Sequence, residues 1–169
     1  MPTNDNTDLP ALGIDVGGVI IDRVADGDDT SFFGGQYLLT PAVPAAFATI
    51  AALVKGRFAG SAYVVSKCGV NTERKTREWL AHNGFHDVTG IPPAHLHFCR
   101  KRPEKGPICA ALRITHFVDD RLEVLSYLDT VRNLYLFRPH ENEVAAHAHV
   151  LPRVTRVDSW PDLAQRISV

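Results

Sequence analysis

Four positions along the chain carry polar, chemically capable side chains, three of them at or just after an apolar run of strand length. Asp15 lies in the run 12–16 ahead of Gly17-Gly18, Ser66 follows 62–65, and Asp119-Asp120 follow 115–118, while Lys105 lies in the basic stretch RKRPEKG. Ligands of open α/β sheets bind outside the carboxyl ends of the strands, so we expect these groups to meet at one sheet edge. Carboxylates hold Mg²⁺, and a hydroxyl and an ammonium bind phosphate oxygens. The set therefore favours phosphoryl chemistry.

Taken in this order, the residues resemble the motifs of the haloacid dehalogenase (HAD) superfamily over about residues 12–157. IDVGGV is similar to the first motif, with Asp15 at the nucleophile, YVVS to the second, with Ser66, and HFVDD to the fourth. The lysine of the third motif is best matched by Lys105, with Arg100, Lys101 and Arg102 as rivals. The stretch from SKCGVNTERKTREWL to HFVDDR looks most like the 5′-nucleotidase-like phosphatase branch.

The resemblance implies an Mg²⁺-dependent phosphatase that hydrolyses a phosphomonoester through an aspartyl-phosphate on Asp15. Its substrate would be a small phosphorylated molecule, with nucleotides and sugar phosphates as candidates. Ser66 and Lys105 would act on the phosphoryl oxygens, and Mg²⁺ would be held by Asp15, the Gly17 carbonyl, Asp119 and Asp120.

The first motif departs from the family pattern at Gly17, because the usual general acid and base stands at that position. General acid catalysis contributes about 10²–10⁴ in rate. An enzyme with this DxG motif should therefore favour good leaving groups, unless another group such as His116 or Asp22 supplies the proton. The alternative is a weakened or inactive HAD-fold protein that binds a phosphorylated ligand or partner.

Apolar runs alternate with segments of helical period, which predicts an α/β fold. We expect a Rossmann-like three-layer sandwich with a mainly parallel sheet and a minimal cap or none. Strands are predicted at 12–16, 62–65, 95–99, 115–118, 133–137 and 154–157, and helices at 43–55, 72–83, 108–113, 121–128 and from Trp160 onward.

The chain is expected to form one domain over 12–169, preceded by a flexible leader over 1–11. Residues 22–40 form a Gly- and Asp-rich insertion that we interpret as a flap. Its aromatic residues Phe32, Phe33 and Tyr37 could cover a substrate or close the core.

The composition narrows the functional class further. A net charge of −1 argues against nonspecific nucleic-acid or membrane binding, and 45% hydrophobic residues argue against a disordered chain. Cys68, Cys99 and Cys109 have no CxxC spacing, so neither disulfides nor a thiolate zinc site is indicated, and a cytoplasmic location is expected. A homodimer is a candidate assembly.

Overall fold

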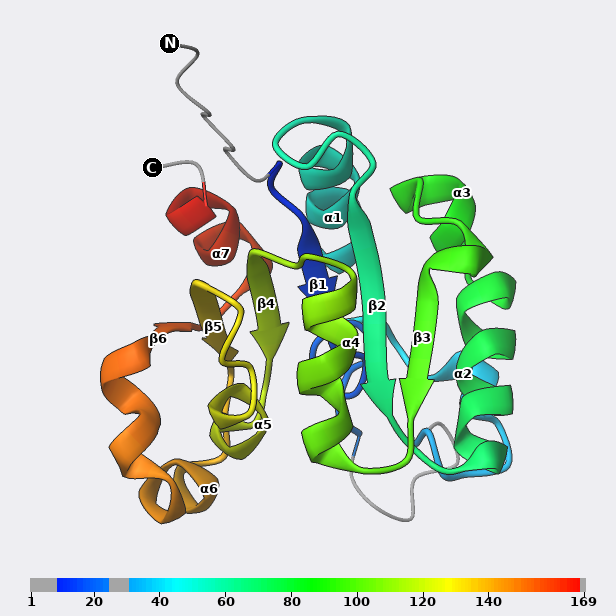
Figure 1. Ribbon diagram of the computed structural model, residues 1–169. Helices are drawn as coiled ribbons and strands as arrows, with labels where there is room; N and C mark the ends of the chain where they lie inside the picture. Colours follow the sequence, from blue (N-terminus) through cyan, green and yellow to red (C-terminus); the bar gives the residue numbers. More distant parts are fainter. Residues whose placement is uncertain (1–8, 25–30, 168–169) are drawn as a thin grey trace, which may run out of the picture.

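The computed structural model describes residues 9–24 and 31–167, and its centre is a six-stranded sheet in which every pair of neighbours is parallel (Figure 1). The strands lie in the order β3-β2-β1-β4-β5-β6. Their bounds are β1 Leu12–Ile14, β2 Ala62–Lys67, β3 Leu96–Cys99, β4 His116–Asp119, β5 Asn133–Phe137 and β6 Val154–Val157. The predicted α/β class and parallel sheet are confirmed.

Helices cover both faces of the sheet and give three layers. One face packs against α1 (Ala46–Lys55), α2 (Val70–His82), α3 (Phe85–Thr89) and α7 (Trp160–Ile167). The other packs against α4 (Lys105–Ala111), α5 (Leu122–Ser126), α6 (Glu141–Ala146) and the 3-10 helix η4 (Ala148–Arg153). Three short 3-10 helices, η1 (Tyr37–Leu39), η2 (Pro93–His95) and η3 (Arg102–Glu104), lie in the connections. The sheet is therefore buried on both faces, as its continuous apolar strands require.

The strand order changes direction between β1 and β4. From β1 the chain moves outward through β2 and β3, and from β4 it moves outward the other way. Ile14 pairs with Val118, and the Asp15 N–H donates to the Val118 carbonyl at 3.0 Å. Asp15 and Asp119 thus stand side by side at the switch point, where open α/β sheets bind their ligands.

Alternation along β1 decides which face each side chain takes. Leu12 and Ile14 belong to the core beneath α1 and α7. Gly13 faces the opposite way, and a Cβ there would lie 2.4 Å from the Phe117 ring. Asp15, two residues after Gly13, is therefore on the α4 side of the sheet.

Several predicted boundaries were wrong. Residues 100–106 were expected to form a loop, but Arg102–Glu104 is η3 and α4 begins at Lys105. Pro103 and Pro107 favour a loop in sequence, yet both lie in first helical turns, where a missing N–H costs little. The second predicted helix, expected from residue 72, begins at Val70.

The remaining elements follow the predictions with smaller shifts. The predicted strands at 133–137 and 154–157 match β5 and β6, and the first strand is shorter than expected. The first helix begins at Ala46, after Pro44. No pattern had predicted α3, α6 or η4, which are short, and η4 contains Pro152.

The segment between β1 and α1 carries no large cap, since η1 is the one helix in its described part. Its second half lies on α2: the Trp79 indole N–H donates to the Thr40 carbonyl at 2.9 Å, and the Tyr37 hydroxyl donates to Glu78. Phe32 is half-buried against the core, whereas Phe33 is 76% exposed. Residues 25–30 of the predicted flap and 1–8 of the predicted leader lie outside the described residues. None of the described helices has the length and apolar character that a membrane crossing needs.

Candidate active site

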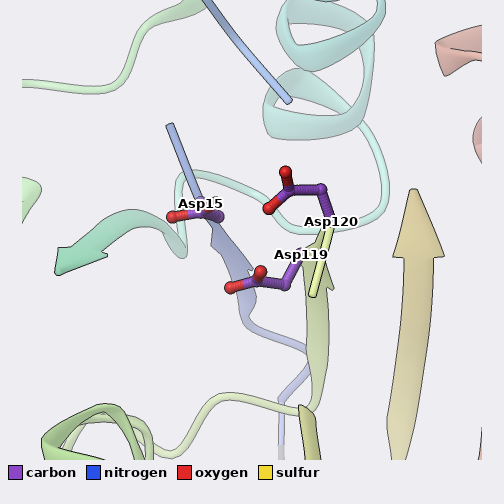
Figure 2. A group of neighbouring side chains, drawn as sticks. All are labelled: Asp15, Asp119 and Asp120. Carbon is purple, nitrogen blue, oxygen red and sulfur yellow. The ribbon is translucent and has the colours of Figure 1, made fainter. Parts of the chain in front are cut away.

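Three carboxylates meet at the carboxyl ends of β1 and β4 (Figure 2). Asp15 comes from the end of β1, Asp119 is the last residue of β4, and Asp120 follows it. Each offers an oxygen within 4.8 Å of the others. Hard carboxylate oxygens at this spacing suit a hard divalent cation such as Mg²⁺, so the donor set fits the predicted metal site.

Lys105 is buried between two of these carboxylates. Its ammonium donates to Asp15 Oδ1 at 2.9 Å and to Asp119 Oδ2 at 2.8 Å, and its side chain is only 2% exposed. The Asp119 carboxylate also accepts the Arg121 N–H at 3.0 Å, which fixes its orientation. One cation therefore holds the acids of two neighbouring strands together.

The position of Lys105 depends on how α4 begins. Gly106 lies against the end of α5, and a Cβ there would be 2.7 Å from the Tyr127 carbonyl oxygen. Just before α4, Arg102 pairs with Glu123 of α5 at 2.9 Å. Glu104 accepts the backbone N–H groups of Arg100 and Lys101. These contacts bring the first turn of α4 against the sheet edge and carry Lys105 into the site.

Burial and charge shift the pKa values of all three buried groups. Burial raises the pKa of Asp15, although the charge of Lys105 opposes this shift. Burial also raises the pKa of Asp119 well above its usual value, and the charge of Asp15 adds to that shift. Burial alone would lower the pKa of Lys105, but the charges of Asp119 and Asp15 outweigh it and raise that pKa. Lys105 is thus fully protonated at neutral pH. Two buried carboxylates share its single charge, and a divalent cation would relieve their repulsion.

A tight turn follows Asp15. The Val16 carbonyl accepts the N–H groups of Val19, Ile20 and Ile21, and Gly18 adopts a left-handed φ of +76°. At Gly17, by contrast, a Cβ would meet no atom within 4 Å. Gly17 matches the general-acid position of the HAD motif, and the space that a side chain there would enter is open.

The carboxylates lie in a pocket of about 690 Å³. Ser66 and Lys67 line it from the end of β2, and Phe32 and Phe33 line it from the segment that follows β1. Its basic side chains are Arg23, Lys67, Arg102, Lys105 and Arg121. Basic side chains beside the carboxylates suit an anion that is held together with a cation.

The structure brings Asp15, Gly17, Ser66, Lys105, Asp119 and Asp120 to this one pocket. Of the third-motif rivals, Arg100 instead binds Glu73 and the Cys68 carbonyl, and Arg102 lines the pocket while pairing with Glu123. Lys105 is the candidate that contacts Asp15.

Two other sequence candidates have different outcomes. His116 pairs with Leu12 at the opposite end of β4 and packs against Phe58, so it is a buried core residue and not a proton donor at this pocket. Asp22 does line the pocket. Arg23, which sequence reasoning missed, pairs with Asp120 at 2.6 Å. In the sequence, Arg23 is marked only as a basic residue that follows the apolar run 19–21 and Asp22. No motif spacing predicts its contact with Asp120.

The fold has a counterpart among solved structures. A crystal structure from Burkholderia xenovorans LB400, provisionally described as a haloacid dehalogenase-like hydrolase, superposes with a TM-score of 0.52 at 17% identity. The match covers 73% of this chain and 57% of the other, so it spans little more than half of that protein. No family model and no curated protein matches the sequence. The likeness establishes a HAD-like α/β fold for this chain.

Proposed function

We propose that this protein is an Mg²⁺-dependent HAD-type phosphatase that hydrolyses a phosphomonoester. The observation that carries the proposal is the Lys105 ammonium, buried between Asp15 and Asp119 with Asp120 beside them. A cluster of this kind is costly to bury. The cluster lies at the switch point of the sheet, where open α/β sheets bind ligands, and this position supports a catalytic role for the buried charges.

In this proposal Asp15 is the nucleophile. One of its carboxylate oxygens attacks phosphorus, the bond from phosphorus to the ester oxygen breaks, and the leaving group departs with the electron pair. Water then hydrolyses the aspartyl-phosphate and regenerates the carboxylate. Lys105 holds one Asp15 oxygen at 2.9 Å, which would orient the other towards the substrate.

The other pocket residues would stabilise charge and position the phosphoryl group. The Ser66 hydroxyl and the Lys105 ammonium would donate to phosphoryl oxygens. Asp15, the Gly17 carbonyl and Asp120, with Asp119 beside them, would hold Mg²⁺. The bound ion would neutralise charge on the phosphoryl oxygens. In phosphoryl transfer, positioning and charge neutralisation supply most of the catalysis.

The branch assignment is part of the proposal. The stretch from SKCGVNTERKTREWL to HFVDDR is similar to the 5′-nucleotidase-like phosphatases, which supports this branch. The described residues contain no large cap, which leaves room for a bulky substrate. Because Gly17 brings no side chain, the leaving group would depart without a proton from that position.

Gly17 also favours a second candidate function. A protein with the same pocket and no proton donor at this position could bind a phosphorylated ligand or partner without turnover. The pocket geometry is the same in both cases, so turnover must separate them.

The test is phosphate release from a panel of aryl, acyl and alkyl phosphomonoesters, with Mg²⁺ and with EDTA. Asp15→Asn keeps the shape of the side chain and removes the nucleophile, so it should abolish turnover and leave the thermal melt close to that of the wild type. Phosphate binding without Mg²⁺-dependent release from any substrate would favour the binding protein. Unchanged turnover in Asp15→Asn would place the chemistry elsewhere.

A further inference from the structure

Arg23 folds back over the turn after β1 and pairs with Asp120. Its Nη2 lies 2.6 Å from Asp120 Oδ2, and its side chain is 35% exposed in the pocket. A Cβ at Gly18 would lie 2.7 Å from Arg23 Nε and 2.8 Å from Asp120 Oδ2. A glycine with left-handed φ at this position therefore makes room for the pair.

The pair occupies one oxygen of a carboxylate that belongs to the candidate metal site. Asp120 is one of the three acids whose oxygens lie within 4.8 Å of one another. A guanidinium and a divalent cation repel each other when both contact the same carboxylate. Lys105 is buried between two other oxygens, whereas Arg23 is partly exposed and can leave Asp120 without opening the core.

The backbone of Arg23 stays close to the site when its side chain moves. The preceding N–H, that of Asp22, donates to the Pro41 carbonyl at 2.8 Å, and the Arg23 N–H donates to Asp22 Oδ1 at 2.9 Å. Beside it, a Cβ at Gly17 would meet no atom within 4 Å. A guanidinium released from Asp120 therefore has open space within the pocket, and its planar fork matches phosphoryl oxygens.

We propose that Arg23 is a substrate-binding residue that neutralises Asp120 in the ion-free protein and is released by a divalent cation to bind the anionic oxygens of the substrate. This inference rests on the proposed phosphatase and adds a coupling between its two ligands. By linkage, the coupling is reciprocal: the cation strengthens anion binding, and the anion strengthens cation binding by the same factor.

The test compares the EDTA-treated wild type with Arg23→Met and Arg121→Met by titration calorimetry, using Mn²⁺ and then inorganic phosphate as probes. Arg121 lines the same pocket, and its loss removes the same charge without removing an ion pair to Asp120. Arg23→Met should bind Mn²⁺ at least about fivefold more tightly than wild type, the lower end of typical coupling between two sites. With saturating Mn²⁺ it should bind phosphate at least about fivefold more weakly. Arg121→Met should change Mn²⁺ affinity less.

The outcomes separate this inference from the proposed activity. If Arg23→Met binds Mn²⁺ no more tightly than wild type, or phosphate no more weakly, the role of Arg23 is wrong, whatever the turnover. If neither protein binds Mn²⁺, both the metal centre and the coupling are overturned. If the affinities shift as expected while no phosphomonoester is hydrolysed, the coupling is supported and the phosphatase activity is refuted. Circular dichroism of each variant checks that the fold is intact.

Discussion

Lys105→Met is the substitution that most directly tests how the site is held together. Methionine keeps most of the aliphatic length and removes the ammonium, which lies 2.9 Å from Asp15, 2.8 Å from Asp119 and 5.6 Å from the centre of the Phe117 ring. Two buried carboxylates then face each other without a cation. Breaking a buried ion pair by removing one partner typically costs about 3–5 kcal/mol, and we expect a loss in that range in the free energy of unfolding.

The pH dependence of this loss has a definite sign. The folded-state pKa values of Asp15 and Asp119 are already raised, and losing Lys105 raises them further. Between the ordinary carboxyl pKa and the raised one, the folded state binds more protons than the unfolded state, so stability falls as pH rises. The destabilisation by Lys105→Met should therefore be larger at pH 7.5 than at pH 5.

Urea unfolding in EDTA, followed by circular dichroism, measures the effect. Lys101→Met is the matched control, because Lys101 is exposed four residues earlier and the same change there should cost less than about 0.5 kcal/mol. Adding Asp119→Asn to Lys105→Met removes one of the two unpaired charges and should recover part of the loss. A loss below about 1 kcal/mol at pH 7.5, or one equal to that of the control, would refute the idea that Lys105 holds these acids together.

Three further substitutions test other parts of the molecule. In Gly17→Asp the new side chain enters open space, so the thermal melt should be unchanged. The variant should raise kcat most for alkyl phosphates, by up to about 10²–10⁴. A uniform effect across leaving groups would contradict a missing general acid. Burial lowers the pKa of His116 to about 4, so the folded state binds fewer protons than the unfolded state between that value and the usual 6.5. The free energy of unfolding should then drop by up to about 2 kcal/mol from pH 7.5 to pH 5, and by less in His116→Gln; equal drops in a urea series would assign the pH dependence to other groups. Phe33→Ala should raise KM for substrates with large leaving groups more than for small ones, since Phe33 lines the pocket and is 76% exposed; equal KM changes would mean that the ring does not contact the substrate.

The sequence predicted the strands better than the start of the helix that carries Lys105. Buried parallel strands are marked by continuous apolar runs, and Asn133–Phe137 and Val154–Val157 were predicted with their true bounds. The stretch 100–106 contains Pro103 and Gly106 among charged residues, a composition typical of a loop. Gly106 is there because α4 approaches the Tyr127 carbonyl, a tertiary contact that no local pattern reveals.

The candidate site shows the same division. The order of polar residues after apolar runs indicated which side chains would converge, because parallel strands all end at one edge of the sheet. The pairing of Arg23 with Asp120 was not predictable, since it joins residues 97 positions apart through the shape of one turn. His116 was considered as a proton donor because it lies only three residues before Asp119, but three residues of extended strand place it at the opposite end of β4, where it pairs with Leu12.

The pairing of β1 with β4 has a consequence for the folding of the chain. The Lys105 to Asp15 contact spans 90 residues, and the contact that ties Ala11 to Thr115 spans 104. Contacts of such long range form late, because the closure entropy of the intervening chain must be overcome first. During synthesis Asp15 emerges before its counter-charge, and the β1 and β2 segments can associate well before β4 exists. The pocket is therefore incomplete in a nascent or half-folded chain, and ligand binding there should return only late in refolding.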